Sequence, residues 1–187
     1  MPAALLPREQ VLERLLSAFR DQGYDGASLT ELSAATGLGK SSLYHYFPGG
    51  KEDMAEQVLA HLDQQLTAAL FEPLRSKQAP ARKLKAMLAT IDAFYEGGKK
   101  ACLLERLCAS VDRGRFRRPL THAFTAWIGA VESLCLEAGL PKGLARHRAE
   151  GLVVRVEGAL VVCAGTGDLR VFARTLEDLR TSLLATP

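Results

Sequence analysis

Apolar residues along this chain recur every three or four positions, which is the pattern of amphipathic helices, while strand-like alternation is hard to find. Glycine and proline residues interrupt the pattern where the periodic stretches end. We therefore expect an all-α fold of about nine helices. The expected helices cover about residues 7–23, 29–36, 40–47, 51–73, 84–97, 102–111, 117–138, 144–164 and 168–185.

Clear start and stop signals flank the second expected helix. Ser28 and Glu31 stand three positions apart and form a capping box, in which each side chain bonds to the other residue's backbone N–H. Gly37 follows the helix and can adopt the left-handed conformation of a tight turn. The residues expected to point inward from this helix and its turn are Leu29, Leu32, Ala35 and Leu38.

The third expected helix, residues 40–47, follows a turn of three or four residues and is closed by Pro48-Gly49-Gly50. Two short helices joined by a glycine-centred turn describe a helix-turn-helix. Leu43 and Phe47 would anchor the second helix, and its outer side would carry donors for phosphates or base edges. An ordinary helical hairpin whose polar side meets only water is the alternative. The outward residues are Lys40, Ser41, Ser42, Tyr44 and His45.

Bulk charge does not identify a partner. The formal net charge is +3, but residues 1–50 hold four Lys or Arg and five Asp or Glu. If this segment binds DNA, its affinity must come from the local placement of donors. A basic run later in the chain is either a solvated loop or a second phosphate contact. This run consists of Arg113, Arg115, Arg117 and Arg118.

The sequence shows no metal or catalytic motif. The four cysteines form no C-x-x-C pair and have no histidine cluster beside them, so we expect no metal and no cofactor. They are either small buried apolar residues or a redox sensor. Serine-hydrolase, phosphate-loop and zinc-protease motifs are absent, so we expect no enzyme, with a small all-helical enzyme as an alternative. The cysteines are Cys102, Cys108, Cys135 and Cys163.

Nothing in the sequence indicates a membrane or an export signal. No apolar run reaches the roughly 20 residues that cross a bilayer, and residues 1–7 lack a basic segment followed by a long apolar core. We therefore expect a cytoplasmic protein with no membrane partner.

Residues 28–47 closely resemble the helix-turn-helix of the TetR family of transcriptional regulators, in which a second helix ends in Leu-Tyr-x-His/Tyr-Phe before a Lys-Glu pair. Here these pieces read Leu43-Tyr44-His45-Tyr46-Phe47 and Lys51-Glu52. The resemblance covers residues 8–60. The insert 48–52 and the segment 101–103 resemble the multidrug- and flavonoid-responsive branch. The departures from the family pattern are Ser33 and Thr36 in place of alanine, and Gly39 in place of a serine or threonine cap.

The resemblance implies a helix-turn-helix DNA-binding domain over residues 1–50, whose helix 40–46 enters the major groove of double-stranded DNA. Ser28 and Lys51 match positions that clamp the DNA backbone, Tyr44 a position that contacts phosphate or thymine, and Tyr46 either touches phosphate or packs. The implied DNA-binding residues are Ser28, Thr30, Lys40, Ser41, Ser42, Tyr44, His45, Tyr46 and Lys51.

The resemblance also implies an effector-binding and dimerisation domain over residues 51–187. The protein would be a homodimeric, ligand-released repressor of a palindromic operator, with control by a protein partner as an alternative. A small apolar or aromatic effector would meet Phe94, Tyr95, Leu103, Arg106, Phe124, Trp127, Ile128 and Arg155. The dimer seam would contain Val153, Val156, Leu160, Leu176 and Leu183, for which packing inside one chain is the alternative.

Overall fold

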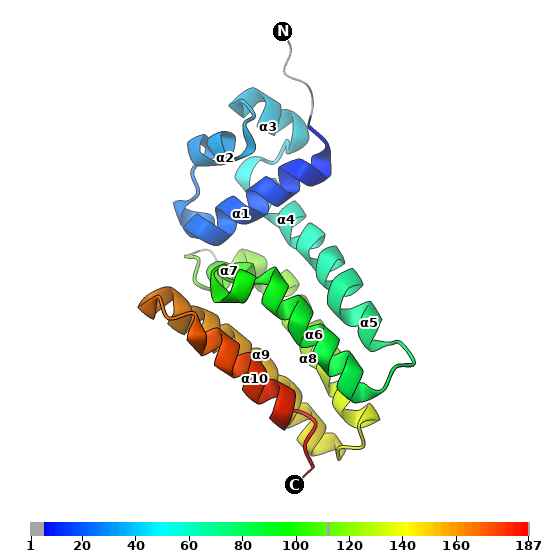
Figure 1. Ribbon diagram of the computed structural model, residues 1–187. Coiled ribbons are helices and arrows are strands. Elements are labelled where there is room, and N and C mark those ends of the chain that lie inside the picture. The colour runs from blue at the N-terminus through cyan, green and yellow to red at the C-terminus, as the bar shows by residue number, and fades with distance from the viewer. Residues whose placement is uncertain (1–5, 112, 187) are drawn as a thin grey trace. The chain divides into compact units, whose positions relative to one another are not determined.

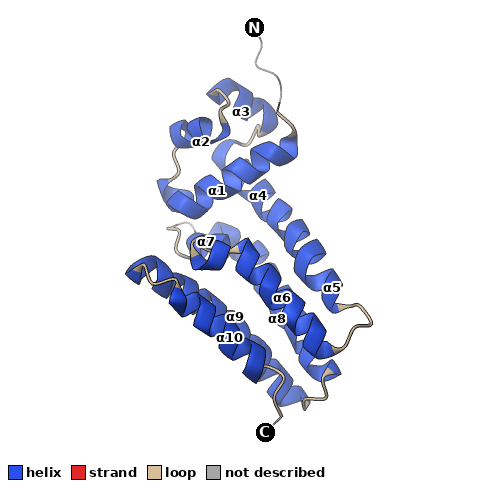
Figure 2. Ribbon diagram, viewed as in Figure 1, coloured by secondary structure: helices blue, strands red, loops and turns tan. Residues whose placement is uncertain are grey.

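The computed structural model describes residues 6–111 and 113–186, and in this part of the chain the regular elements are all helical (Figure 2). Helix α4, a π-helical turn at Thr67–Phe71 and α5 follow one another without a break, so the described residues form nine separate helices, as expected. A short 3₁₀ turn, Glu96–Gly98, follows α6. The helices are α1 (Arg8–Gly26), α2 (Leu29–Thr36), α3 (Lys40–Tyr46), α4 (Gly50–Leu66), α5 (Glu72–Leu74), α6 (Pro80–Phe94), α7 (Leu103–Cys108), α8 (Arg113–Glu137), α9 (Lys142–Thr166) and α10 (Arg170–Ser182).

The chain forms two compact units. The first unit contains residues 1–64 and 103–117, and the second contains residues 65–102 and 118–187. The first unit is larger than the segment 1–50 expected to bind DNA, because most of α4 and all of α7 belong to it. Helix α7 packs against α1, and Met54 and Val58 of α4 are fully buried. The role assigned to each segment remains a prediction.

Helix α1 supplies one wall of the core of the first unit. Val11, Leu15 and Phe19 are completely buried and follow the helical spacing seen in the sequence. At Gly23 the backbone leaves the helical region, with φ of 71° and ψ of 174°. The helix expected to end near Gly23 is therefore interrupted at this residue. The chain then continues in a further turn to Gly26.

The second helix has the capping box that the sequence predicted. The Ser28 hydroxyl accepts from the Glu31 N–H at 3.3 Å, and the Glu31 carboxylate accepts from the Ser28 N–H at 2.7 Å. Gly37 closes α2 in the left-handed region, with φ of 71°. The inward position of Ala35 was predicted wrongly. Ala35 is exposed and Thr36 is buried instead, because the Thr36 hydroxyl donates to the Leu32 carbonyl at 2.7 Å and needs no water.

The long helices of the second unit, α6, α9, α10 and most of α8, lie side by side (Figure 1). Their shared core includes Ile91, Val131 and Val156, all fully buried. Helix α8 begins at Arg113, four residues before the expected start, and contains Pro119 in its interior. The start was predicted too late because proline usually occupies the first turn of a helix, which placed Pro119 near the beginning.

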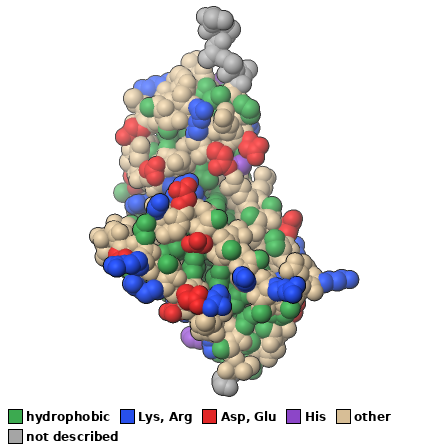
Figure 3. Space-filling view, in the orientation of Figure 1, with side chains coloured by type: hydrophobic (Ala, Val, Ile, Leu, Met, Phe, Trp, Pro, Cys, Tyr) green, Lys and Arg blue, Asp and Glu red, His purple; other side chains and the backbone are tan. Residues whose placement is uncertain are grey.

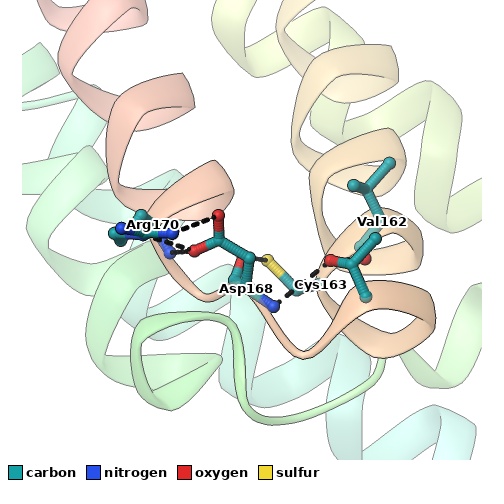
Figure 4. A network of polar contacts seen from close by, with 5 residues as sticks. Val162, Cys163, Asp168 and Arg170 are labelled. Carbon is teal, nitrogen blue, oxygen red and sulfur yellow. Dashed lines mark hydrogen bonds and ion pairs between the residues drawn. The ribbon is translucent and has the colours of Figure 1, made fainter.

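A polar network closes the turn between α9 and α10 (Figure 4). The Asp168 carboxylate accepts from the Arg170 N–H at 3.0 Å and pairs with the Arg170 guanidinium at 2.8 Å. These bonds lower the pKa of Asp168. The sequence predicts Asp168 as the N-cap of the last helix, but α10 begins at Arg170, so its N-cap is Leu169 and Asp168 reaches the helix from one residue further out. The Cys163 thiol donates to the Asp168 carbonyl at 3.4 Å. The spacing of apolar residues predicts an inner face of α10 that contains Ala173, Leu176 and Leu179. The two leucines are buried, whereas Ala173 is exposed.

One side of α9 is both apolar and exposed. Val154 and Val161 lie seven residues apart with exposed fractions of 69% and 52%, so they share one face of the helix. Gly151, Gly158 and Gly165 repeat at the same seven-residue spacing on that face, and a Cβ at any of them would meet nothing within 4 Å. This exposed α9 face is thus smooth as well as apolar.

Candidate nucleic-acid interface

One side of helix α3 is anchored in the core, and the other side is exposed to solvent. Leu43 and Phe47 are completely buried, which fixes the helix on the first unit's core. The outer side carries Lys40, Ser41, Tyr44 and His45, all exposed, together with the half-buried Ser42. The arrangement presents cationic, hydroxyl and imidazole groups on a fixed support, which suits contact with phosphates and base edges.

Tyr44 is held in place although 46% of its surface is exposed. The chain passes close to its ring at Gly50, where a Cβ would lie 3.5 Å from the ring's Cε1 atom. Gly50 has φ of 68°, a conformation that favours glycine. The ring therefore rests against the start of α4, and nearly half of the residue's surface is exposed.

Tyr46 and Arg8 tie α3 to the start of α1. The Tyr46 hydroxyl donates to the Leu6 carbonyl at 2.6 Å, and Arg8 donates to the Tyr46 carbonyl at 3.2 Å. The Arg8 guanidinium lies 5.1 Å from the centroid of the Phe47 ring, in cation–π geometry. Of the two roles left open for Tyr46, these contacts favour packing. The part played by Arg8 was missed, because a single arginine at a helix start gives no sequence signal.

The predicted phosphate clamps sit in a mixed electrostatic environment. Ser28 and Thr30 are exposed. The Ser28 N–H is occupied by Glu31, and its hydroxyl oxygen accepts a bond, so the hydroxyl hydrogen is the donor that Ser28 can offer to a phosphate. The bonds from Ser28 lower the pKa of Glu31, which favours its negatively charged form.

Lys51 lies over the ring of Tyr24, with 4.5 Å from its Nζ atom to the ring centroid. Burial lowers the pKa of Lys51, while the nearby charges of Asp25 and Glu31 act in the opposite direction. A phosphate would therefore meet a lysine that already has acidic and aromatic neighbours. Acidic and basic side chains are also interspersed over the face drawn in Figure 3.

A segment from the middle of the chain completes the first unit. The Asp25 carboxylate at the end of α1 accepts from the Ser110 hydroxyl at 3.1 Å and from the Val111 N–H at 2.8 Å. The Phe116 ring packs edge-on against Tyr24, with 4.9 Å between centroids. We call these contacts the Asp25 junction. They connect the loop after α7 to the helix that supports α2 and α3.

The basic run of α8 is divided between different surroundings. Arg115 pairs with Glu52 at the start of α4, while Arg117 and Arg118 are exposed. The side chain of Arg113 lies outside the described residues. Neither of the two roles considered for the run is tested by these positions.

The sequence profile of the bacterial regulatory proteins of the tetR family matches residues 11–58, which include α2 and α3. The HTH-type transcriptional regulator YxaF of Bacillus subtilis is 32% identical over 162 residues, covering 83% of each chain. The chain belongs to the TetR family. LmrA of B. subtilis, an HTH-type transcriptional regulator, is 23% identical over 161 residues, covering 83% of this chain and 85% of LmrA. A TetR regulator from Legionella pneumophila has the same fold, with a TM-score of 0.82 at 17% identity over 94% of this chain and 96% of its own.

Membership of the TetR family establishes a DNA-binding transcriptional regulator with a helix-turn-helix and a larger helical part. Regulators of this family typically act as dimers, and the relatives of this chain are regulators, which are not enzymes. None of the helices within residues 6–111 and 113–186 has the length and apolar content needed to cross a lipid bilayer.

The structure places the predicted seam residues of this TetR-family protein inside the second unit. All five are buried within the single chain, so they have almost no surface to offer a second copy. Internal packing, the alternative considered for them, describes their position. The helical period was read correctly, but the side of α9 that faces outward carries Val154 and Val161. The buried residues are Val153, Val156, Leu160, Leu176 and Leu183.

The predicted effector residues fall in both units. Leu103 and Arg106 lie on α7 in the first unit, and the remaining six lie in the second. Arg155 is exposed and bonds to Asp178 on α10 at 3.3 Å, a position that does not suit an enclosed ligand site. The other members of the second unit are buried or half-buried. They are Phe94, Tyr95, Phe124, Trp127 and Ile128.

Trp127 has an unusual polar group in this interior. Only 4% of the side chain is exposed, and its Nε1–H is buried without a hydrogen-bond acceptor. A buried donor left unbonded costs about 1–3 kcal/mol, so an acceptor brought to it by a ligand would be favoured.

The described cysteines do not join a metal site. No group of three or more potential metal ligands occurs among residues 6–111 and 113–186. Cys102, Cys135 and Cys163 are buried, and burial raises the pKa of the Cys135 thiol to about 11. Cys108 is exposed, so the description of all four as small buried residues was wrong for this one.

Proposed function

We propose that this TetR-family protein is a homodimeric repressor that binds a palindromic operator and releases it when a small apolar or aromatic effector binds. The observation that carries the proposal is the outer side of α3, where exposed donors stand on fully buried anchors. Lys40, Ser41, Ser42, Tyr44 and His45 would face the major groove. Ser28, Thr30 and Lys51 would hold the DNA backbone.

The exposed α9 face supports the homodimer. Exposed valines cost free energy in water, and a second copy of the same face would remove them from it. The glycines at every seventh position add no side chain beside the valines, so two copies of the face can approach closely at those points. A dimer with two-fold symmetry would offer one α3 helix to each half-site of a palindrome.

The contacts of α7 support control by an effector. Leu103 and Arg106, two of the predicted effector contacts, lie on a helix that packs against α1, and the loop after it is bound at the Asp25 junction. A ligand that moves α7 would therefore act directly on α1, which packs against α2 of the helix-turn-helix. Effector binding would favour a conformation with lower affinity for the operator.

Lys40→Ala and Tyr44→Ala test the DNA-binding side of the proposal. Each removes one group that would bond to DNA, so we expect operator affinity to fall by about 10- to 100-fold. Lys40→Ala should also reduce the slope of affinity against salt by about one unit. The affinity and its salt dependence are measured by fluorescence anisotropy, with palindromic duplexes selected from a random pool. Lys99→Ala, an exposed lysine of the second unit, is the matched control. Unchanged affinity in both variants would contradict the proposed interface.

Trp127→Phe tests the effector side. Trp127 is the chain's only tryptophan, so a flavonoid with carbonyl and phenol oxygens should change the protein's fluorescence directly if it binds there. The phenylalanine variant keeps an apolar ring and loses the N–H, so releasing operator should require about three to ten times more flavonoid. Operator affinity without flavonoid should stay at the wild-type value. Failure of a broad panel of such compounds to release the operator from the wild-type protein would count against effector control.

A further inference from the structure

The turn between α2 and α3 determines where the DNA-reading helix points, and it lacks the usual support. Gly39 occupies the N-cap position of α3 with φ of −64° and ψ of 155°, and no side chain caps the helix. A serine, threonine, aspartate or asparagine there would accept from a backbone N–H of the first helical turn. Glycine offers no such bond and leaves its own backbone freer to move.

The structure supplies a different support from inside α2. The Ser33 hydroxyl donates to the Leu38 carbonyl at 2.5 Å. The Thr36 hydroxyl lies 3.4 Å from the Leu38 nitrogen, whose N–H it accepts. Both backbone polar groups of Leu38 are thus bonded to side chains of the preceding helix. Leu38 itself is 5% exposed, so its side chain holds the same point of the turn from the core.

Helix α1 strengthens this support. The Arg14 guanidinium donates to the Thr36 carbonyl at 2.6 Å, which links the last turn of α2 to α1. The same Nη1 atom would lie 3.4 Å from a Cβ at Gly37, so the arginine also fills the space beside the left-handed residue. Thr36 is completely buried, so its hydroxyl bonds form away from competing water.

We infer that Ser33 and Thr36 are positioning residues for operator recognition, which hold the Leu38 backbone and so replace the missing side-chain cap at Gly39. They touch no DNA in this scheme. Leu43 and Phe47 would still anchor α3, but loss of the two hydroxyls would loosen its N-terminal end at the turn, and the donors there would match the base edges less often. Binding to the operator would weaken, whereas binding to non-specific DNA, which depends on phosphate charge, would change little.

The test uses the full-length double variant Ser33→Ala/Thr36→Val, which removes both hydroxyls while keeping similar side-chain shapes. We expect operator affinity to fall by about 5- to 10-fold, the size of effect that follows loss of one helix cap. Affinity for a scrambled duplex should change by less than about twofold, since phosphate contacts alone support it. Adding Gly39→Ser to the double variant supplies the ordinary cap and should restore most of the operator affinity.

Thr90→Val is the matched control, because Thr90 on α6 makes the same kind of bond to its own helix, to the Ala86 carbonyl at 3.1 Å. If the double variant unfolds, Ser33→Ala alone and Thr36→Ser, which keeps the hydroxyl, provide the comparison, with loss expected only in the first. Equal losses on operator and scrambled DNA, or no recovery with Gly39→Ser, would overturn the inference.

The inference rests on DNA reading by α3, which is part of the proposed function. The two can fail separately. A normal loss in Lys40→Ala with an unchanged Ser33→Ala/Thr36→Val variant refutes the positioning role alone. No loss in Lys40→Ala or Tyr44→Ala refutes the interface itself.

Discussion

Val161→Glu is expected to convert the protein from a dimer to a monomer and to reduce its operator affinity by about 1,000-fold, close to the level of non-specific binding. Val161 is 52% exposed on α9, so a glutamate there can extend its carboxylate into water in the single chain and should leave its fold intact. In the proposed dimer the two-fold axis would bring two such carboxylates into one apolar contact. Burying charges without partners costs far more than the contact gains.

The loss of affinity follows from the loss of a half-site. In the proposed dimer, two linked α3 helices would engage a palindrome together, and the second would bind at a high effective concentration. A monomer retains only one half-site's contacts. Sedimentation analysis gives the oligomeric state, and anisotropy with full and half operators gives the affinities.

Leu136→Glu is the matched control for this prediction, because Leu136 is a comparably exposed apolar residue on α8, outside the exposed α9 face. It should remain dimeric and bind the full operator normally. A Val161→Glu protein that stays dimeric would show that the two copies meet elsewhere.

Phe47→Ala is expected to lower the free energy of unfolding by about 3–5 kcal/mol, the usual cost of removing a buried aromatic ring. Phe47 is completely buried, and Arg8 stacks on its ring, so the substitution leaves a cavity and removes a cation–π contact. A domain is commonly stable by only about 5–15 kcal/mol. DNA binding should therefore disappear at temperatures where the second unit is still helical.

Tyr44 is the control for Phe47 within the same helix. It is 46% exposed, so Tyr44→Ala should alter stability much less while still weakening operator binding. Urea unfolding followed by circular dichroism measures stability, and anisotropy at low temperature measures binding. Similar stability losses in the two variants would mean that α3 is not anchored as described.

The helices and the helix-turn-helix were predictable because they depend on local rules. The capping box at Ser28, the turn at Gly37 and the anchors Leu43 and Phe47 each follow from residue type and spacing, and the structure has all of them. The burial of Ala35 and Thr36 was predicted the wrong way round, because residue polarity alone places alanine inside and threonine outside. A threonine that bonds to its own helix at Leu32 escapes this rule.

Long-range contacts were not predictable in the same way. Helical spacing identified apolar stripes on α9, but it could not tell which stripe the chain's own core would cover, so Val153 was chosen and Val154 was overlooked. The Asp25 junction joins Asp25 to residues that lie 85 and 86 positions further along the chain, and no local pattern predicts contacts at such separations. The roles of Arg8 and Arg14 were missed for the same reason.

The glycines of α9 place a limit on how this protein can be improved. A helix interior with glycine is less stable than one with alanine by roughly 1 kcal/mol per site. Exchanging Gly158 for alanine would strengthen the isolated helix, but in the proposed dimer the added methyl groups would force the two facing backbones apart. The same substitution would thus raise the stability of a single chain and lower the affinity of the two copies for each other. Selection for a more stable chain and selection for a tighter dimer therefore favour different residues at this position.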